Sequence, residues 1–195
     1  MGCHVVERHD TELIGKGYAL SYLLSTMIDS GVADDYDAYF VFDADNRLDR
    51  HYVEEMNKAF QSGFRILTSY RNSVNLADNW VSSGSALWFI RESRFLNNSR
   101  MILGSSCHVG GTGFMFSREV MRRNRGWKFH LLTEDLEFTM DSILHATASD
   151  TAAPPCCTTS SRSRSSRAAS ATALEQGIPA GVPVLRHGAD QAGRA

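Results

Sequence analysis

The run Tyr36–Phe42 is the segment that most constrains the fold of this chain. Apart from Asp37 it consists of aromatic residues, Val and Ala, and it ends in the acidic sequence Asp43-Ala44-Asp45. A run that is apolar at consecutive positions is typical of a strand covered on both faces of its sheet. We therefore predict a central, buried strand with two carboxylates at its carboxyl end.

Helical and strand patterns alternate around this run. Helical spacing of apolar residues predicts helices over 15–30, 50–61, 78–98, 117–123 and 133–144, and a second strand is expected over 64–70 and a glycine-interrupted strand or loop over 107–116. This alternation predicts an α/β domain with a mostly parallel sheet and flanking helices. Ligands of such sheets bind at the carboxyl ends of the strands, where Asp43 and Asp45 lie.

Composition divides the chain of 195 residues near Ala146. All 10 Phe, 6 Tyr and 3 Trp precede this residue, and all 4 Pro follow it. The first part, residues 1–145, can form a core, whereas the Ala/Ser/Thr-rich tail, residues 146–195, has too few large apolar residues to offset the entropy of ordering. We therefore expect one domain followed by a disordered, low-complexity tail.

Charge and hydropathy exclude several classes of protein. The net charge of −2 shows no basic excess for nucleic-acid binding. The four cysteines lack Cys-x-x-Cys spacing, the histidines lack metal-ligand spacing and are expected to be loop or surface residues, and the chain has neither a leader pattern nor an apolar stretch of spanning length. The chain by itself is thus expected to be soluble and cytoplasmic.

Asp43 and Asp45 are candidates for a divalent-cation site. Two carboxylates at i and i+2 after a buried strand can hold Mg²⁺ or Mn²⁺, whose other ligands are water and substrate phosphates. A calcium loop is excluded because Leu48 stands where that loop needs Gly and Arg47 where it needs an oxygen ligand. A phosphatase of the haloacid dehalogenase class stays open as an alternative, although Arg47 replaces its usual Thr or Val.

Two further segments carry candidate groups, each with a structural alternative. The glycines of Gly111-Thr112-Gly113 permit a ligand to approach the backbone closely, but they are also typical of a β-bulge. Thr133-Glu134-Asp135 opens a predicted helix, where Thr can cap the helix and acids interact favourably with its dipole. Either reading is compatible with the residues alone.

Taken together, these segments resemble a known family. Lys16-Gly17-Tyr18, Phe42–Asp45, Gly111–Gly113 and Thr133–Asp135 occur in the order and at about the separations found in the inverting family 2 glycosyltransferases. The pattern is most similar to membrane-associated, processive enzymes akin to hyaluronan, chitin, cellulose and poly-N-acetylglucosamine synthases. The resemblance extends over roughly residues 5 to 145 and implies a partial GT-A fold, a Rossmann-like nucleotide-diphospho-sugar transferase domain.

The resemblance also implies roles on the donor side. The donor would be a UDP-sugar, with Mg²⁺ or Mn²⁺ as cofactor. Asp45 would bind the metal that bridges the diphosphate, and Asp43 would contact the nucleotide sugar or a metal-bound water. Lys16 would lie near the nucleotide and its diphosphate.

On the acceptor side, the resemblance implies that Gly111, Thr112 and Gly113 form the floor of a site for a saccharide or glycolipid. Glu134 would border this site, and Asp135 would be the general base. A base of this kind typically contributes a factor of 10² to 10⁴ to the rate.

Two parts of the family pattern are not found in the chain. The family begins with a nucleotide-binding strand that does not precede Met1, and its Gln-x-x-Arg-Trp segment is absent from residues 146–195. Codons that encode Ser170–Val184 can encode Gln-Arg-Leu-Arg-Trp when read one base later. We therefore expect a fragment with an out-of-frame tail, whose full-length form works at the cytoplasmic face of a membrane. A non-catalytic fragment is the alternative.

Overall fold

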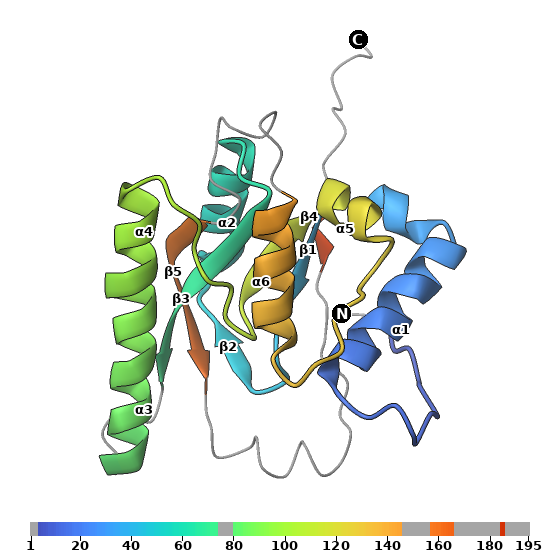
Figure 1. The fold of residues 1–195 in the computed structure, drawn as a ribbon, viewed down its shortest axis with the longest axis horizontal. Coiled ribbons are helices and arrows are strands. Elements are labelled where there is room, and N and C mark those ends of the chain that lie inside the picture. Colours follow the sequence, from blue (N-terminus) through green and yellow to red (C-terminus); the bar gives the residue numbers. More distant parts are fainter. Residues whose placement is uncertain (1–3, 74–79, 146–156, 166–183, 186–195) are drawn as a thin grey trace.

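The computed structural model of the chain describes residues 4–73, 80–145, 157–165 and 184–185 (Figure 1). Its elements in chain order are α1 (Lys16–Asp29), η1 (Val32–Asp35), β1 (Ala38–Val41), β2 (Asn46–Leu48), α2 (Tyr52–Gln61), β3 (Ile66–Ser73), α3 (Trp80–Ile90), η2 (Arg91–Asn97), α4 (Asn98–Ile102), β4 (Phe114–Ser117), α5 (Arg118–Asn124), α6 (Glu134–Leu144), β5 (Cys157–Ser165) and β6 (Val184–Leu185). The predicted helices and strands of residues 15–144 are therefore present. The short strand β2 and the π-helical turn of η2 are additions.

The described strands form one sheet in the order β2-β5-β3-β4-β1-β6. β1 and β3 run in the same direction, but β4 lies between them and is antiparallel to both, and only β3 and β5 form a parallel pair. The expectation of a mostly parallel sheet is thus wrong, and the α/β class is right. Because β4 is antiparallel to β3 and to β1, it starts at the end of the sheet where those two strands finish. The start of β4 therefore lies beside the carboxyl end of β1, where Phe114 pairs with Val41.

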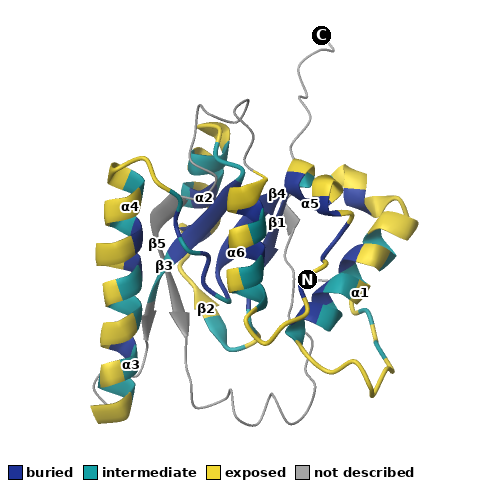
Figure 2. Ribbon diagram, viewed as in Figure 1, coloured by how far each residue is buried: buried dark blue, intermediate teal, exposed yellow. Residues whose placement is uncertain are grey.

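β1 contributes side chains to two hydrophobic cores, which explains why its sequence is apolar at every position. Tyr39 and Val41 belong to one core, and Ala38, Phe40 and Phe42 belong to the other. The first core includes side chains from α1, β4 and α6 (Leu20, Leu24, Phe114, Phe116, Phe138), and the second includes side chains from α2, β3 and β4 (Tyr52, Met56, Leu67, Met115). Figure 2 shows the resulting buried strands between helices that are exposed on their outer faces.

Part of the tail differs from the expected disorder. Cys157–Ser165 form β5, which pairs with β3 from Leu67 to Ser73 and with β2 from Asn46 to Leu48. The unpaired main-chain groups at the edge of β3 can hydrogen-bond to a neighbouring strand whatever its side chains are, so a sequence poor in apolar residues can still extend a sheet. Residues 146–156, 166–183 and 186–195 lie outside the described residues.

Within the described ranges, no helix is both long enough and apolar enough to cross a bilayer.

Candidate functional site

Lys16, the first residue of α1, lies where three other segments meet. Its Nζ is 2.6 Å from Oδ1 of Asp43 and 4.0 Å from Oε1 of Glu134, and it donates a hydrogen bond to the carbonyl oxygen of Gly111. The Lys16 side chain is only 22% exposed. One partly buried cation therefore joins the start of α1, the end of β1, the glycine segment and the start of α6. Each of these four places carries one of the four sequence motifs.

The local backbone explains how Lys16 reaches this position. Gly15, the N-cap residue that precedes α1, has a φ of 137°, a conformation that side-chain-bearing residues rarely adopt. Gly17 packs against the backbone of Phe129 and His130, where a Cβ would lie 3.1 Å from the Cα of His130 and closer still to the carbonyl oxygen of Phe129. The two glycines thus let the amino end of α1 approach the segment before α6.

Thr112 connects the glycine segment to the acidic turn. Its Oγ1 accepts a hydrogen bond from the backbone N–H of Asp43 at 2.8 Å and another from Nδ2 of Asn46. Asp45 is half-buried within this turn, which is closed by the hydrogen bond from Asn46 N to the Asp43 carbonyl oxygen at 3.0 Å. The structure therefore brings Asp43 and Thr112 into direct contact and places Asp45 in the same tight turn.

Gly113 completes the segment and leads into β4. Its φ of 68° lies in the left-handed region that favours glycine. Its N–H donates to the carbonyl oxygen of Val41 at 2.8 Å, and its own carbonyl oxygen accepts from Tyr52 at 3.0 Å and from Ser69 Oγ at 2.8 Å. The segment enters the sheet in this way, without the β-bulge that was the structural alternative: the pairing of β4 with both of its neighbours has no register shift.

Asp135 lies in the first turn of α6 against the glycine segment. A Cβ on Gly111 would be 3.4 Å from Oδ2 of Asp135, so any side chain at position 111 would contact this carboxylate. Oδ1 accepts a hydrogen bond from the N–H of Leu136 at 2.8 Å. Thr133 occupies the N-cap position, but its side chain makes no capping hydrogen bond. The expected N-cap position of Thr133 and the acids in the first turn are therefore confirmed, whereas the side-chain capping hydrogen bond is not formed.

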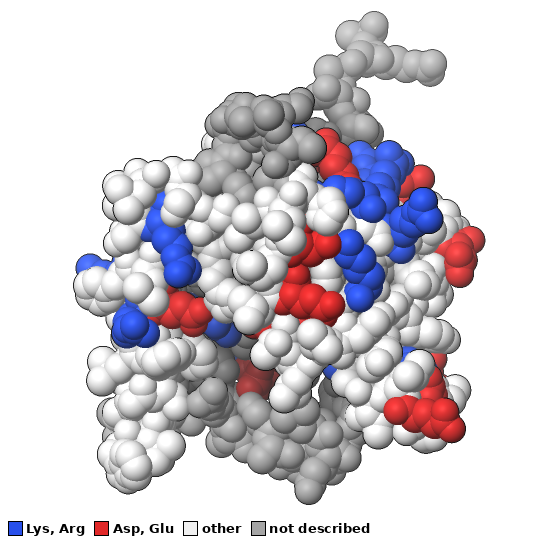
Figure 3. Space-filling view, viewed as in Figure 1, with Lys and Arg blue, Asp and Glu red and all other residues white. Residues whose placement is uncertain are grey.

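Acidic side chains gather over α6 in the middle of one face of the molecule, beside basic side chains over α5 (Figure 3). Glu134, the first residue of α6, has a side chain that is only 13% exposed. Burial raises the pKa of Glu134, the charge of Lys16 opposes this rise, and the nearby carboxylates of Asp135 and Asp43 add to it. The negative charge of Glu134 is thus held at a cost in folding free energy.

We expect Glu134→Gln to raise the free energy of unfolding near neutral pH by about 1 kcal/mol or less. Because the pKa of Glu134 is raised above its ordinary value of 4.5, the stabilisation from its protonated form is complete below that pH and is lost as the pH rises through the folded-state value. Thermal unfolding of variant and parent should therefore agree at pH 4 and diverge toward pH 7. Glu137→Gln, in the same turn, is the control. A variant less stable than the parent at pH 7 would show that the pairing with Lys16 outweighs burial.

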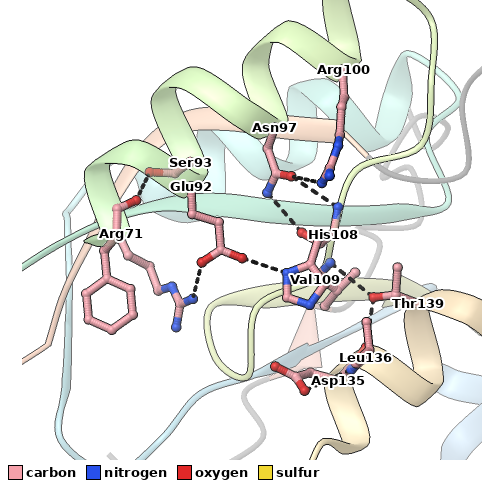
Figure 4. A network of polar contacts seen from close by, with 11 residues as sticks. Arg71, Glu92, Ser93, Asn97, Arg100, His108, Val109, Asp135, Leu136 and Thr139 are labelled. Carbon is pink, nitrogen blue, oxygen red and sulfur yellow. Dashed lines mark hydrogen bonds and ion pairs between the residues drawn. The ribbon is translucent and has the colours of Figure 1, made fainter. Parts of the chain in front are cut away.

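A second polar network, which sequence reasoning missed, lies beside Asp135 (Figure 4). Nδ1 of His108 is 2.7 Å from Oε1 of Glu92, and Nη2 of Arg71 is 3.9 Å from Oε2 of the same carboxylate. The hydrogen bond to His108 is the main reason why the pKa of Glu92 is lowered. As expected, His108 lies in a loop, between α4 and β4, but its side chain is only 26% exposed and makes this contact.

Main-chain contacts connect this network to α6. The N–H of Val109 donates to Thr139 Oγ1 at 3.1 Å, and that hydroxyl donates to the carbonyl oxygen of Asp135 at 2.8 Å. The segment that leads to Gly111 is therefore tied both to Glu92 and to the first turn of α6. No short motif includes Glu92 or His108, and nothing in the pattern of their sequence neighbours predicts that the two meet.

A comparison with protein families identifies the class. Residues 40–170, more than half of the chain, match the family described as glycosyl transferase family group 2. The chain belongs to this family and is a glycosyltransferase domain, whose substrates are a nucleotide sugar and an acceptor. This family match excludes the phosphatase alternative. The matched region ends at residue 170, beyond the domain boundary expected at residue 145. No curated protein matches the chain at a significant level.

Proposed function

We propose that this domain transfers a sugar from a UDP-sugar to a hydroxyl group of a saccharide or glycolipid, with inversion and with Mg²⁺ or Mn²⁺ as cofactor. The observation that carries the proposal is the meeting of Asp43, Gly111 and Glu134 around the ammonium group of Lys16. This arrangement offers a cation for phosphate oxygens next to carboxylates for a divalent metal. By resemblance to membrane-associated synthases, we also propose that the full-length protein acts at the cytoplasmic face of a membrane.

On the donor side, Lys16 is the group that would contact the diphosphate, while Asp43 and Asp45 would hold the cation. Among the described residues, no group of three or more His, Cys, Asp or Glu side chains is placed to bind a metal. Two aspartates in one turn fit a cation that takes most of its ligands from water and phosphate oxygens. The bound cation would offset the negative charge that develops on the leaving diphosphate.

On the acceptor side, Asp135 is the group that would take the proton of the acceptor hydroxyl. As the proton moves to the carboxylate, the acceptor oxygen forms a bond to the anomeric carbon, and the bond from that carbon to the diphosphate breaks with its electron pair leaving on UDP. Attack on the face opposite the leaving group inverts the configuration. The N–H of Leu136 orients the carboxylate, and Gly111 leaves room beside it.

Calorimetric titration of the 195-residue chain with UDP tests the donor side. We expect micromolar binding that depends on Mn²⁺, and we expect Lys16→Met to weaken it by roughly 10- to 100-fold, because a charge-assisted hydrogen bond to phosphate contributes about 1.5–3 kcal/mol. Lys58→Met is the matched control, since Lys58 makes only surface ion pairs on α2. If the folded parent chain binds UDP no better with Mn²⁺ than without it, the proposal fails and the non-catalytic alternative holds.

A further inference from the structure

Asn46, the residue after the second aspartate, carries an amide oxygen with an unusual environment. Oδ1 is buried and has no hydrogen-bond partner among the described residues. The amide nitrogen of the same side chain donates to Thr112 Oγ1, and the backbone N–H donates to Asp43 at 3.0 Å. Leaving a buried acceptor unpaired costs roughly 1–3 kcal/mol, so an orphan in a native structure indicates an unseen partner such as an ion or water.

Thr112 determines where this oxygen points. Its Oγ1 receives both the Asn46 amide nitrogen and, at 2.8 Å, the backbone N–H of Asp43, so the Asn46 side chain is held on the turn that carries both aspartates. With the nitrogen engaged, Oδ1 is directed away from Thr112. Asn46 and Thr112 are 66 residues apart in the sequence, and no sequence motif predicts their contact.

The charges around Asp43 and Asp45 give a reason why an uncharged side chain such as Asn46 would serve as a cation ligand at this turn. Oδ1 of Asp43 is 2.6 Å from Nζ of Lys16, so part of the negative charge of the aspartate pair is already balanced by an ammonium group. Hard divalent cations accept amide oxygens of Asn as well as carboxylates. An amide oxygen adds a ligand at this turn without adding the repulsion that a third carboxylate would bring.

We propose that Asn46 is a third oxygen-bearing side chain of the divalent-cation site, with Oδ1 contacting the cation or a water molecule bound to it. The inference rests on the proposed function, in which a cation accompanies the UDP-sugar. Thr112 then acts as a positioning residue, since its hydroxyl holds the amide nitrogen and thereby presents the oxygen.

Binding measurements on the 195-residue chain test this assignment without requiring turnover. UDP affinity is measured by calorimetry with and without Mn²⁺, and Mn²⁺ binding in the presence of UDP is followed by electron paramagnetic resonance. We expect Asn46→Leu, which keeps the approximate volume, to weaken Mn²⁺-dependent binding by about 10- to 100-fold and to leave metal-free UDP binding unchanged. Asn57→Leu on α2, at a position of similar partial exposure, is the matched control.

Two more variants keep the result interpretable if Asn46→Leu does not fold. Asn46→Asp retains an oxygen at Oδ1 and should bind Mn²⁺ more tightly than Asn46→Leu, and Thr112→Val should weaken Mn²⁺ binding through loss of the positioning hydroxyl. Unchanged Mn²⁺ affinity in a folded Asn46→Leu, or an affinity in Asn46→Asp no better than that of Asn46→Leu, would overturn the inference and identify the oxygen as the site of a structural water. A parent chain without Mn²⁺-dependent UDP binding would instead overturn the proposed function, and the inference with it.

Discussion

Asp135→Asn is expected to lower the rate of sugar transfer by at least 10²- to 10⁴-fold in the enzyme that contains this domain, because an amide cannot take the proton of the acceptor hydroxyl. The substitution preserves the local structure, since an Asn oxygen can still accept from the N–H of Leu136 and the backbone carbonyl that binds Thr139 is unchanged. The loss should appear in kcat, measured as UDP release, while affinity for the UDP-sugar in calorimetry stays the same.

The neighbouring carboxylate provides the control for this experiment. Glu137→Gln removes one negative charge from the same turn of α6 but lies outside the group of side chains around Lys16, so its turnover should be close to that of the parent. Unchanged turnover in Asp135→Asn would remove Asp135 as the base. A fall in UDP-sugar affinity without a fall in kcat would assign it to substrate binding instead.

Gly17→Ala should destabilise the domain by roughly 1–3 kcal/mol, the usual cost of forcing extra atoms into a well-packed site. Within a helix, replacing Gly by Ala ordinarily stabilises by up to about 1 kcal/mol. At Gly17 the new methyl group would meet the backbone of Phe129 and His130, with the His130 Cα at 3.1 Å, and backbone cannot move aside as a flexible side chain can. Chemical denaturation followed by circular dichroism measures the change.

Gly84→Ala is the matched control, because Gly84 lies in α3 and no atom of the described residues lies within 4 Å of the position of its Cβ. We expect this variant to gain up to about 1 kcal/mol from helix propensity alone. If both variants were stabilised, the close approach of α1 to the segment before α6 would not exist in solution. The position of Lys16 would then also need revision.

Much of the secondary structure could be predicted from local pattern. The apolar run before Asp43 and the helical spacing of residues 15–30 and 50–61 correspond to β1, α1 and α2, because burial on one or both faces leaves a periodic record in the sequence. The direction of β4 relative to its neighbours could not be predicted from the sequence pattern. Its four residues, Phe114–Ser117, are buried at every position, and the same pattern fits a strand of either direction.

The candidate site shows the same division. Lys16, Asp43, Gly111 and Glu134 belong to four separate short motifs, and the structure brings them together around one ammonium group. The contacts of His108 with Glu92 and of Asn46 with Thr112 could not be predicted, because each joins residues from separate elements whose spacing carries no periodic signal.

The sequence alone determined that the fold is α/β, and it brought out four short motifs as candidates for chemistry, since periodicity and motif order are properties of the chain. Only the tertiary structure decided that β4 runs antiparallel between β1 and β3, and that Lys16 is shared among three segments. It also reverses the expected effect of a methyl group at Gly17. The physical reason is that propensity acts within a few residues, whereas steric contact and Coulomb energy depend on distances that only the packed chain defines.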